Sequence, residues 1–481
     1  MKAEEIALIQ SKHNAAIIAP AGHGKTEMIA QLVDRLPGKK LVITHTNAGV
    51  SALSKRFDKY DVDKKKYTLS TIAAFCMRWC EAYPKTAEID TGIGVTDEGF
   101  YPGQHNGARR IFTHRWAQSV LQSSYSYVIV DEYQDCVLEQ HGIFLAINVS
   151  VPVYVLGDPL QSIFGWAGKP VSWNKLGFEV LKEEIETYPW RWDNGNRELG
   201  QYLTEIRDTF LPALDKQEVL ISTVPVGNYI RRVSPINATR TQFLKEISEY
   251  DSVLYLTKWP KDQCSFSQRS GGVFQNDEAQ NLKDLYLFAQ FLDDDDGYKR
   301  ANTIFDFIAE CATQVTTELK SYGKHIRDGS FSFNRITSYP EFGIRMSQLY
   351  QEHGYNEMIR VLEWIRNNGK FRLYRRELYT ELIRSIRHAR DNETTILEAA
   401  KQIRMIPNNQ SRYSNFKRLS SRTVLSKGLE FDCVVIDLSK AHLPRNKFTA
   451  TEMYVAMTRA MQVIYFISDS DNVTLEVPQG L

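Results

Sequence analysis

The sequence has few cysteines and no long hydrophobic run, and each of these shortages excludes a class of protein. Its six cysteines are scattered over 481 residues, so a disulfide framework is not expected. Cys76 and Cys80 can share a helix face, but no second ligand pair lies nearby to complete a metal site. No apolar stretch approaches the ~20 residues that cross a membrane, and the first residues, MKAEEIALIQSKHN, lack the apolar core of a signal peptide. We therefore expect a cytoplasmic protein.

The charge balance leaves the partners open. With 59 basic and 58 acidic residues the net charge is +1, and a basic groove can still lie on a neutral protein. The hydrophobic fraction of 43% and the charged fraction of 24% are those of a folded chain. The length indicates several compact units rather than one domain.

One segment predicts a phosphate-binding loop. Residues 15–19 are a short apolar run typical of a buried strand, and residues 20–24 are a turn of mostly small residues. From Lys25 to Leu36 apolar residues recur at helical spacing, and Pro37-Gly38 ends the helix. Strand, loop, Gly-Lys-Thr and helix are the context that such a loop requires, although Ala19 stands where the general motif begins with glycine.

Each residue type in this loop suits a phosphate. Glycine at 22 and 24 allows close approach of the backbone, whose N–H groups surround the anion at the helix N-terminus. Lys25 would contact the β- and γ-phosphates of ATP, and the Thr26 hydroxyl would bind Mg²⁺. The expected nucleotide contacts are Ala21, Gly22, His23, Gly24, Lys25 and Thr26.

A second segment, YVIVDEYQD at 127–135, adds paired carboxylates. An apolar strand ends in Asp131, which could hold Mg²⁺, and Glu132, which could orient and deprotonate a water molecule. Alone, an Asp-Glu pair after a strand indicates a solvated turn. Together with the upstream loop it favours catalysis.

Further segments, in order along the chain, resemble the motifs of UvrD/Rep-type superfamily 1 helicases. DEYQD resembles their Walker B motif, THTN at 44–47 a single-strand-contacting motif, and VLGDPLQSIFGWAG at 155–168 a segment that joins a phosphate-sensing glutamine to a base-contacting aromatic. KGLEF at 427–431 and YVAMTRA at 454–460 are also matched. The resemblance implies an α/β fold with two RecA-like P-loop domains, ATP and Mg²⁺ as ligands, and movement along single-stranded DNA from 3′ to 5′.

The resemblance also implies roles for single residues. Gln161 would sense the γ-phosphate, while Arg191 in TYPWRW and Arg459 in MTRA would be arginine fingers that stabilise charge in the transition state. For Arg191 an ordinary surface arginine is the alternative, because only part of its motif is present. Gln10 would read the adenine, and Gly428 and Glu430 would contact the nucleotide from the second domain.

The DNA-facing positions depart from the family. The expected contacts are Thr44, His45, Thr46, Asn47, Phe164 and Trp166. However, His45 stands where a phenylalanine is frequent, Ala73 and Val424 replace histidines, and Ala167 replaces an arginine. ATP hydrolysis is therefore better supported than vigorous strand separation.

The motifs also predict the domain organisation. We expect a first RecA-like domain at 1–78 and 119–190, with a reduced insertion at 79–118 whose stretch 91–107 has the Gly/Pro content of a loop. A second RecA-like domain would comprise 191–295 and 414–481, with a mostly helical insertion at 296–413.

Two segments of the insertion have two interpretations each. Residues 370–390 interleave Lys and Arg with Phe371, Tyr374 and Tyr379, as for contact with a nucleic acid or as for a helix that buries its aromatics. The acidic run 293–296 indicates a solvated turn rather than a metal site.

Three functions follow. The chain could be an autonomous DNA translocase or helicase of repair or recombination. It could instead be the motor subunit of a larger complex, such as the UvrD-like subunit of Gabija-type antiphage systems with its nuclease partner. A nucleotide-switched DNA-binding protein without unwinding is the third.

Overall fold

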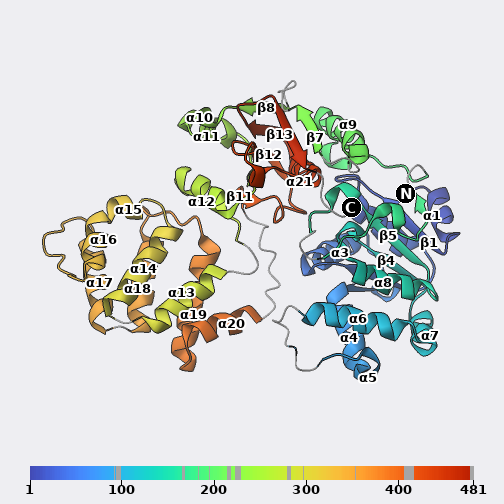
Figure 1. Cartoon of the computed structure of the whole chain (residues 1–481), viewed down its shortest axis with the longest axis horizontal. Helices are drawn as coiled ribbons and strands as arrows, with labels where there is room; N and C mark the ends of the chain where they lie inside the picture. Colours follow the sequence, from blue (N-terminus) through green and yellow to red (C-terminus); the bar gives the residue numbers. More distant parts are fainter. Residues whose placement is uncertain are drawn as a thin grey trace. The chain divides into compact units, whose positions relative to one another are not determined.

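The computed structural model describes residues 1–90, 93, 99–164, 168–181, 184–193, 195–213, 218–222, 229–278, 283–295, 297–352, 354–405 and 416–476 (Figure 1). The chain forms two compact units. Unit 1 comprises Met1–Arg231, Lys440–Ile464 and Ser470–Leu481, and unit 2 comprises Arg232–Ser439 and Tyr465–Asp469. In the described part of the chain, every helix is too short or too polar to span a membrane.

Unit 1 is built on a six-stranded parallel sheet in the order β3-β2-β4-β5-β1-β6. Its strands are apolar on both faces, as expected for a parallel sheet covered by helices on both sides. In β1, Ala16 packs into one hydrophobic core while Ala15 and Ile17 pack into the other. The strands are β1 (Asn14–Ile18), β2 (Lys40–Thr44), β3 (Tyr67–Thr71), β4 (Tyr127–Val130), β5 (Val153–Gly157) and β6 (Val180–Leu181).

Unit 1 also contains helices before, between and after these strands. They are α1 (Ala3–Gln10), α2 (Lys25–Arg35), α3 (Asn47–Lys59), α4 (Ile72–Ala82), α5 (Pro84–Ala87), α6 (Phe100–Phe112), α7 (Arg115–Ser124), α8 (Leu138–Asn148), α9 (Arg197–Ala213) and α21 (Ala450–Met457). Short 3-10 helices are η1 (Lys64–Lys66), η2 (Tyr133–Asp135), η3 (Pro159–Gln161), η5 (Trp173–Lys175), η6 (Trp190–Trp192) and η7 (Pro444–Asn446). A separate antiparallel pair joins β7 (Glu218–Ser222) to β14 (Asn472–Glu476).

The strand register brings the sequence motifs of unit 1 to one edge. Ile18 pairs with Gly157, Thr44 with Thr71, and Val130 with Val155. Because all these strands are parallel, the segments that follow β1, β2, β4 and β5 leave the sheet at its carboxyl edge. Ligands of open α/β sheets bind at this edge.

The expectation of a loop over residues 91–107 is partly wrong, because α6 begins at Phe100. Proline is tolerated in the first turn of a helix, where Pro102 lies. Gly107 is required by packing, since a Cβ there would lie 3.0 Å from the Cys80 sulfur and 3.1 Å from the Ala87 Cβ. Gly107 therefore allows close packing between helices and does not mark a loop.

Unit 2 contains most of a second six-stranded sheet, in the order β10-β11-β9-β12-β13-β8. The strands β10, β11, β9 and β12 run parallel, and the division between the units passes through β8 and β13. The strands are β8 (Ile230–Val233), β9 (Val253–Thr257), β10 (Gln275–Asn276), β11 (Arg418–Arg422), β12 (Phe431–Asp437) and β13 (Ala460–Ile467).

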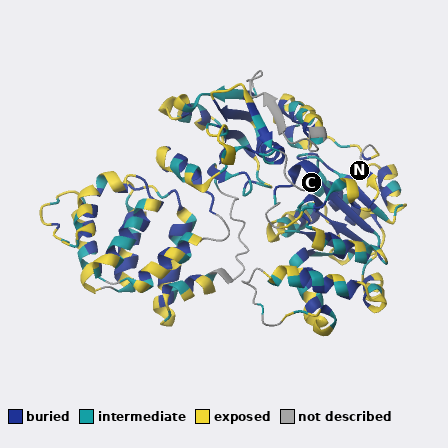
Figure 2. Ribbon diagram, in the orientation of Figure 1, coloured by how far each residue is buried: buried dark blue, intermediate teal, exposed yellow. Residues whose placement is uncertain are grey.

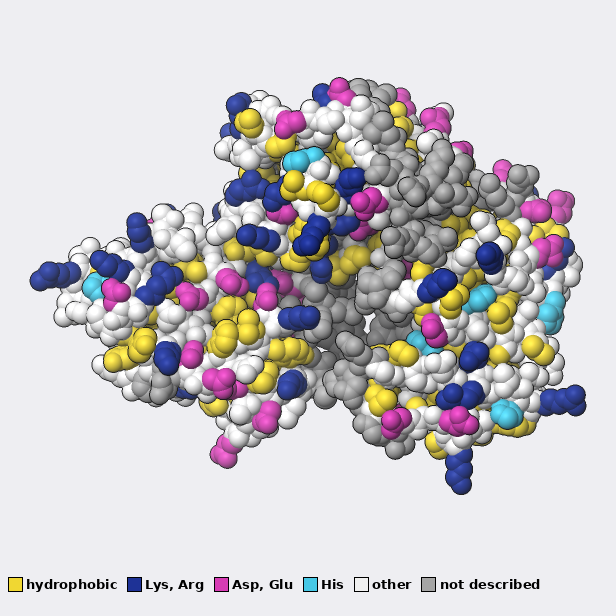
Figure 3. Space-filling view, in the orientation of Figure 1, with side chains coloured by type: hydrophobic (Ala, Val, Ile, Leu, Met, Phe, Trp, Pro, Cys, Tyr) yellow, Lys and Arg dark blue, Asp and Glu magenta, His cyan; other side chains and the backbone are white. Residues whose placement is uncertain are grey.

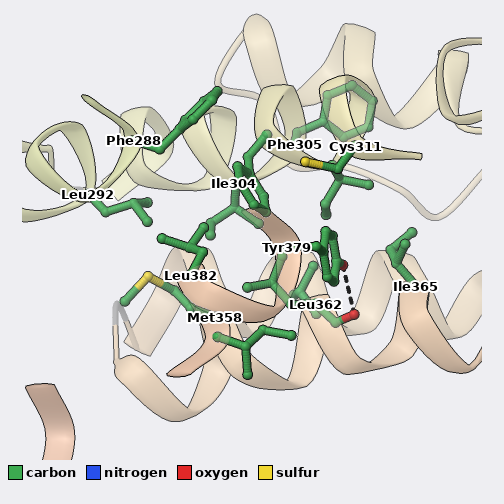
Figure 4. Packing of buried hydrophobic residues seen from close by; sticks show 14 of the residues in the cluster. Phe288, Leu292, Ile304, Phe305, Cys311, Met358, Leu362, Ile365, Tyr379 and Leu382 are labelled. Atoms are coloured by element: carbon green, nitrogen blue, oxygen red, sulfur yellow. Dashed lines mark hydrogen bonds between the residues drawn. The ribbon is translucent and has the colours of Figure 1, made fainter. Parts of the chain in front are cut away.

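Helices make up the rest of unit 2, and those from α13 onward form one bundle (Figures 1 and 2). In Figure 4, Tyr379, Leu362 and Ile304 meet inside its core, and the Tyr379 hydroxyl donates to the Leu362 carbonyl at 2.8 Å. The helices are α10 (Pro235–Ala238), α11 (Thr241–Ser248), α12 (Pro260–Arg269), α13 (Lys283–Asp294), α14 (Gly297–Cys311), α15 (Val315–Glu318), α16 (Lys320–Arg327), α17 (Pro340–Glu352), α18 (Tyr355–Asn367), α19 (Arg376–Asn392) and α20 (Ile396–Met405).

The predicted fold class is confirmed: an α/β protein with two mainly parallel sheets, a small helical insertion in the first and a larger one in the second. Within the acidic run, Asp293 and Asp294 belong to α13 rather than to a solvated turn. Both carboxylate oxygens of Asp293 accept backbone N–H groups at the start of α20, from Ile396 and Leu397 at 2.9 Å each.

Candidate nucleotide-binding site

The loop between β1 and α2 has the backbone that a phosphate cradle needs. Gly22 and Gly24 have φ of +73° and +82°, in the region where side chains are strained. A Cβ on Gly22 would also lie 2.7 Å from a ring carbon of Trp192. Gly24 precedes the first turn of α2, whose N–H groups have no partner within the helix and can receive an anion.

The side chain of Lys25 lies between the two carboxylates predicted to be catalytic. Its Nζ is 3.3 Å from Asp131 Oδ1 and 2.5 Å from Glu132 Oε1, although β5 separates the strands β1 and β4 that precede these residues. Burial alone would lower the pKa of Lys25, but these carboxylates outweigh it and raise the pKa, so the lysine is charged. The three residues that the sequence assigned to phosphate and water chemistry are therefore in direct contact.

Asp131 and Glu132 differ in environment. Burial raises the pKa of Asp131, although Lys25 opposes the shift, whereas the Glu132 side chain is 30% exposed. Glu132 itself has φ of +53°, a left-handed backbone that is rare for a non-glycine residue. Its carboxylate accepts from the Gln134 amide, and Asp131 Oδ1 accepts the Glu132 N–H at 2.8 Å. The strained turn after β4 thus directs both carboxylates to Lys25.

The oxygen donors at this site fit a hard cation. Thr26 lies in the first turn of α2, next to the lysine that contacts Asp131. Among the described residues no cluster of three or more His, Cys, Asp or Glu side chains could hold a metal. A hydroxyl and one carboxylate suit Mg²⁺, which takes its other ligands from phosphates and water.

The segment after β5 reaches the phosphate loop through Asp158. This carboxylate is fully buried, and Oδ2 accepts the Ala21 N–H at 3.2 Å and the Gln161 amide at 3.0 Å. Gln161, the predicted γ-phosphate sensor, is therefore tied to the same carboxylate that holds the loop.

The predicted arginine finger Arg191 lies against the loop. Its backbone N–H donates to the Gly22 carbonyl at 3.1 Å, and its Nη1 donates to the Thr458 carbonyl at 2.6 Å. Trp192, which is buried, donates from Nε1 to the Ala460 carbonyl at 2.7 Å. The 3-10 helix η6 therefore connects the phosphate loop to the YVAMTRA segment.

Arg459 is buried at 2% exposure, at the end of α21. Its Nε donates to the Val455 carbonyl at 2.9 Å and its Nη2 to the Thr458 hydroxyl at 3.0 Å. Arg191 and Arg459, the two predicted arginine fingers, therefore both donate to Thr458, within unit 1. The neighbouring Tyr454 hydroxyl is buried beside Asp158, and burial raises its pKa.

His23 is also part of the loop. Its Nδ1 contacts the Ala21 carbonyl at 3.0 Å, and burial lowers its pKa, so the ring is neutral at pH 7.

The other predicted nucleotide contacts lie outside this loop. Gln10 is exposed at the end of α1. Gly428 and Glu430 lie in unit 2, between β11 and β12.

The residues expected to face DNA follow β2 and β5 at the carboxyl edge. Thr44 is buried as the last residue of β2, and Thr46 caps α3 by accepting the Gly49 N–H at 3.0 Å. Asn47 is exposed, and His45 Nε2 lies 3.5 Å from the Cys136 sulfur. Phe164 is half-buried, and Trp166 lies outside the described residues.

Of the two interpretations of residues 370–390, the structure supports the buried one. Phe371, Tyr374 and Tyr379 are at most 3% exposed, so they cannot stack on bases. Three arginines of α19 pair with acidic neighbours: Arg384 with Glu381, Arg387 with Glu363 and Arg390 with Asp391. In Figure 3, Lys and Arg alternate with Asp and Glu over the visible face of this bundle.

Several residues of the site were not predicted. Asp158 stood in a quoted motif, and its strand-end position was a usable signal. No signal in the sequence indicated Arg207, because a single arginine in α9 looks like a surface residue. In the structure it pairs with Asp158 at 3.0 Å. Trp190, 60% exposed, lies against Gly24, where a Cβ would be 3.2 Å from its ring.

Comparison with known proteins agrees with this geometry. A family profile described as an AAA domain matches residues 3–167. A segment of 103 residues is 27% identical to the Gabija protein GajB of Bacillus cereus (strain VD045), covering 19% of this chain and 21% of that protein. The match thus spans about a fifth of the length of GajB.

Among solved structures, the complex of Arterivirus nonstructural protein 10 (helicase) with DNA aligns over 97% of this chain and 63% of that chain, at 10% identity and a TM-score of 0.35. Residues 3–167 thus match an AAA domain, and with the GajB match the predicted resemblance to UvrD/Rep-type superfamily 1 helicases is confirmed.

Proposed function

We propose that this chain is a DNA-dependent ATPase that moves along single-stranded DNA. The observation that carries the proposal is the position of Lys25, in contact with Asp131 and Glu132 at the mouth of a glycine-containing loop and a helix N-terminus. A lysine that exchanges carboxylates for phosphates explains the arrangement.

The exchange suggests how binding prepares hydrolysis. When the β- and γ-phosphates of ATP enter the loop, they compete for the Lys25 ammonium. Glu132 then loses its closest cation and becomes a better proton acceptor. It would take the proton from a water molecule that attacks the γ-phosphate.

Mg²⁺ would be held by the Thr26 hydroxyl and Asp131, and when bound it supplies positive charge to the phosphate oxygens. Gln161, Arg191 and Arg459 would complete the site from the other side of the phosphates. Arg191 is held close to the loop, because its backbone N–H donates to the Gly22 carbonyl. Gln10, Gly428 and Glu430 would contact the rest of the nucleotide.

The DNA would follow the carboxyl edge of the sheet in unit 1. Thr46 and Asn47 would contact the backbone, and His45, Phe164 and Trp166 would contact bases. The first RecA-like domain would comprise 1–78 and 119–190, with an insertion at 79–118. The second would comprise 191–295 and 414–481, with an insertion at 296–413. The 3′→5′ direction rests on the family resemblance.

The similarity to GajB favours a second form of the same function, in which the chain is the motor or DNA-sensing subunit of an antiphage or repair complex with a nuclease partner. Only about a fifth of GajB is matched, so this form needs its own test. Unwinding of a 3′-tailed duplex by the purified chain alone would contradict a need for a partner. Unwinding only after a nuclease subunit is added would support it.

The direct test is ATP hydrolysis with and without single-stranded DNA, for the natural chain and for Lys25→Ala. We expect hydrolysis that DNA stimulates and that the variant lacks. Hydrolysis that no single-stranded nucleic acid stimulates would contradict the motor and favour a nucleotide-switched binding protein.

A further inference from the structure

The buried ion pair between Arg207 and Asp158 links α9 to the nucleotide site. Arg207 Nη2 lies 3.0 Å from Asp158 Oδ1, and the two side chains are 5% and 0% exposed. Buried carboxylates are costly unless they are paired, so Asp158 depends on this guanidinium. Arg207 is also 17 positions beyond Trp190 in the chain, outside every motif that the sequence indicated.

Asp158 holds two parts of the site at once. Its Oδ2 accepts the Ala21 N–H of the phosphate loop and the amide of Gln161, while Oδ1 accepts Arg207 and the Leu160 N–H at 3.2 Å. The Asp158 backbone N–H donates to Gln134 Oε1 at 3.1 Å, and the amide of Gln134 donates to Glu132. One buried network therefore joins the loop, the glutamine and the candidate base.

The position of Arg207 is set by this network rather than by its own hydrogen-bonding needs. In the described part of the chain its Nε is buried with no hydrogen-bond partner. A buried donor that is left unpaired is destabilising. An arginine kept only for stability would gain by satisfying that group, whereas one kept to hold Asp158 need not.

We propose that Arg207 is a positioning residue for ATP hydrolysis. Through Asp158 it holds the phosphate loop at Ala21 and aims the amide of Gln161, without contacting the nucleotide itself. This inference rests on the proposed function, because it gives Arg207 a role in that same site. It also makes α9 a part of the machinery, so a movement of α9 changes how the γ-phosphate is held.

The proposal predicts a specific pattern of loss. Without Arg207, Asp158 shifts, Gln161 loses its direction, and contact with the γ-phosphate suffers more than contact with the α- and β-phosphates. A misplaced positioning group of this kind lowers rates by about 10- to 100-fold. The preference for a non-hydrolysable ATP analogue over ADP should fall toward one. General loss of stability would weaken both nucleotides alike.

The experiment uses the full chain with Arg207→Lys, Arg207→Met and the double variant Asp158→Asn/Arg207→Met, which removes both charges and so avoids an unpaired buried carboxylate. Arg375→Lys is the matched control, because Arg375 pairs with Glu278 at 2.8 Å in unit 2 with both side chains at most 8% exposed. Melting temperature, kcat, KM for ATP and the affinities for ADP and the ATP analogue are measured for each.

We expect Arg207→Met and the double variant to lose kcat by about 10- to 100-fold and to lose the analogue preference. Arg207→Lys should keep part of both, and Arg375→Lys should change only the melting temperature. The proposal is overturned if the double variant stays folded and keeps both the natural kcat and the analogue preference. It is also overturned if the double variant loses affinity for ADP and for the ATP analogue alike, as a general loss of stability predicts. A natural chain that neither binds nor hydrolyses ATP would instead contradict the proposed function itself.

Discussion

The Lys25 ammonium and the Glu132 carboxylate are 2.5 Å apart, although they come from the start of a helix and the end of a strand more than a hundred residues later. The contact is possible because β1 and β4 are both parallel strands of one sheet, separated only by β5. Lys25 therefore contacts Glu132, the candidate base, and would also bind the phosphates.

Replacing Glu132 by Gln separates binding from hydrolysis. The amide keeps the size of the side chain but cannot accept a proton, so kcat should fall by about 10²- to 10⁴-fold. Nucleotide affinity should be kept or increased, because Lys25 no longer has this carboxylate as a competitor for phosphate. Steady-state hydrolysis and equilibrium binding of a fluorescent nucleotide check both parts, with the exposed Glu139→Gln as control.

Equal losses of binding and hydrolysis in Glu132→Gln would argue against this role. They would indicate that the strained turn, rather than the carboxylate, is what the substitution disturbs.

Gly22→Ala should damage the phosphate loop, whereas Gly103→Ala should not. At Gly22 the φ of +73° is strained for alanine and a Cβ would lie 2.7 Å from Trp192. At Gly103, inside α6, nothing lies within 4 Å of an added Cβ, and alanine should stabilise the helix by about 0.5–1 kcal/mol. Chemical denaturation and nucleotide binding measure the contrast. Full nucleotide affinity in Gly22→Ala would contradict the loop geometry.

Arg459→Lys should lower kcat more than nucleotide affinity. Lysine keeps the charge but loses the planar fork that now donates to the Val455 carbonyl and the Thr458 hydroxyl. Arginine fingers contribute about 10³-fold or more to kcat. The exposed Arg445→Lys is the matched control in the same unit. If both variants hydrolyse ATP at the natural rate, Arg459 is a structural residue.

Stability should fall as the pH drops below neutrality. Burial lowers the pKa of His105 and of His141, both in unit 1, from the ordinary value of 6.5. Below that value the unfolded chain binds protons that the folded chain does not, so acid favours unfolding and the stabilising contribution is present above it. Denaturation at pH 7.5 and 5.5 measures the loss. His105→Gln should reduce it, and an unchanged pH dependence would show that His105 titrates normally in the folded chain.

Tyr379→Phe distinguishes a core aromatic from a DNA contact. The substitution removes the hydrogen bond to the Leu362 carbonyl, which should cost about 1 kcal/mol of unfolding free energy. Affinity for single-stranded DNA should be unchanged because the ring is fully buried. A loss of DNA affinity without a loss of stability would restore the nucleic-acid interpretation of this helix.

The parts of the site that local sequence could predict are those made by consecutive residues. The strand, loop and helix at 14–35 follow from apolar spacing and two glycines, and the carboxylates follow from the end of β4. Arg207 could not be predicted, because its role arises only when α9 packs beside Asp158. Likewise the glycines of residues 91–107 signal a loop in sequence, while Gly107 is needed for close packing against Cys80.

The helical bundle shows the opposite limit. The insertion at 296–413 is expected to be mostly helical, and the helices from α14 to α20 lie within it. Which side chains of the bundle are buried could not be predicted in the same way. Arg375 looks like an exposed cation in the sequence, but it lies buried and pairs with Glu278, Asp284 and Glu310. Charge patterns alone cannot separate such a pair from a binding surface.

The most direct measurement is the ATP hydrolysis rate of the purified chain as single-stranded DNA is added, with Lys25→Ala and Glu132→Gln in parallel. The account predicts a rate that rises and saturates with DNA in the natural chain and is absent in both variants. A rate indifferent to any single-stranded nucleic acid, or one that survives in Lys25→Ala, would contradict it.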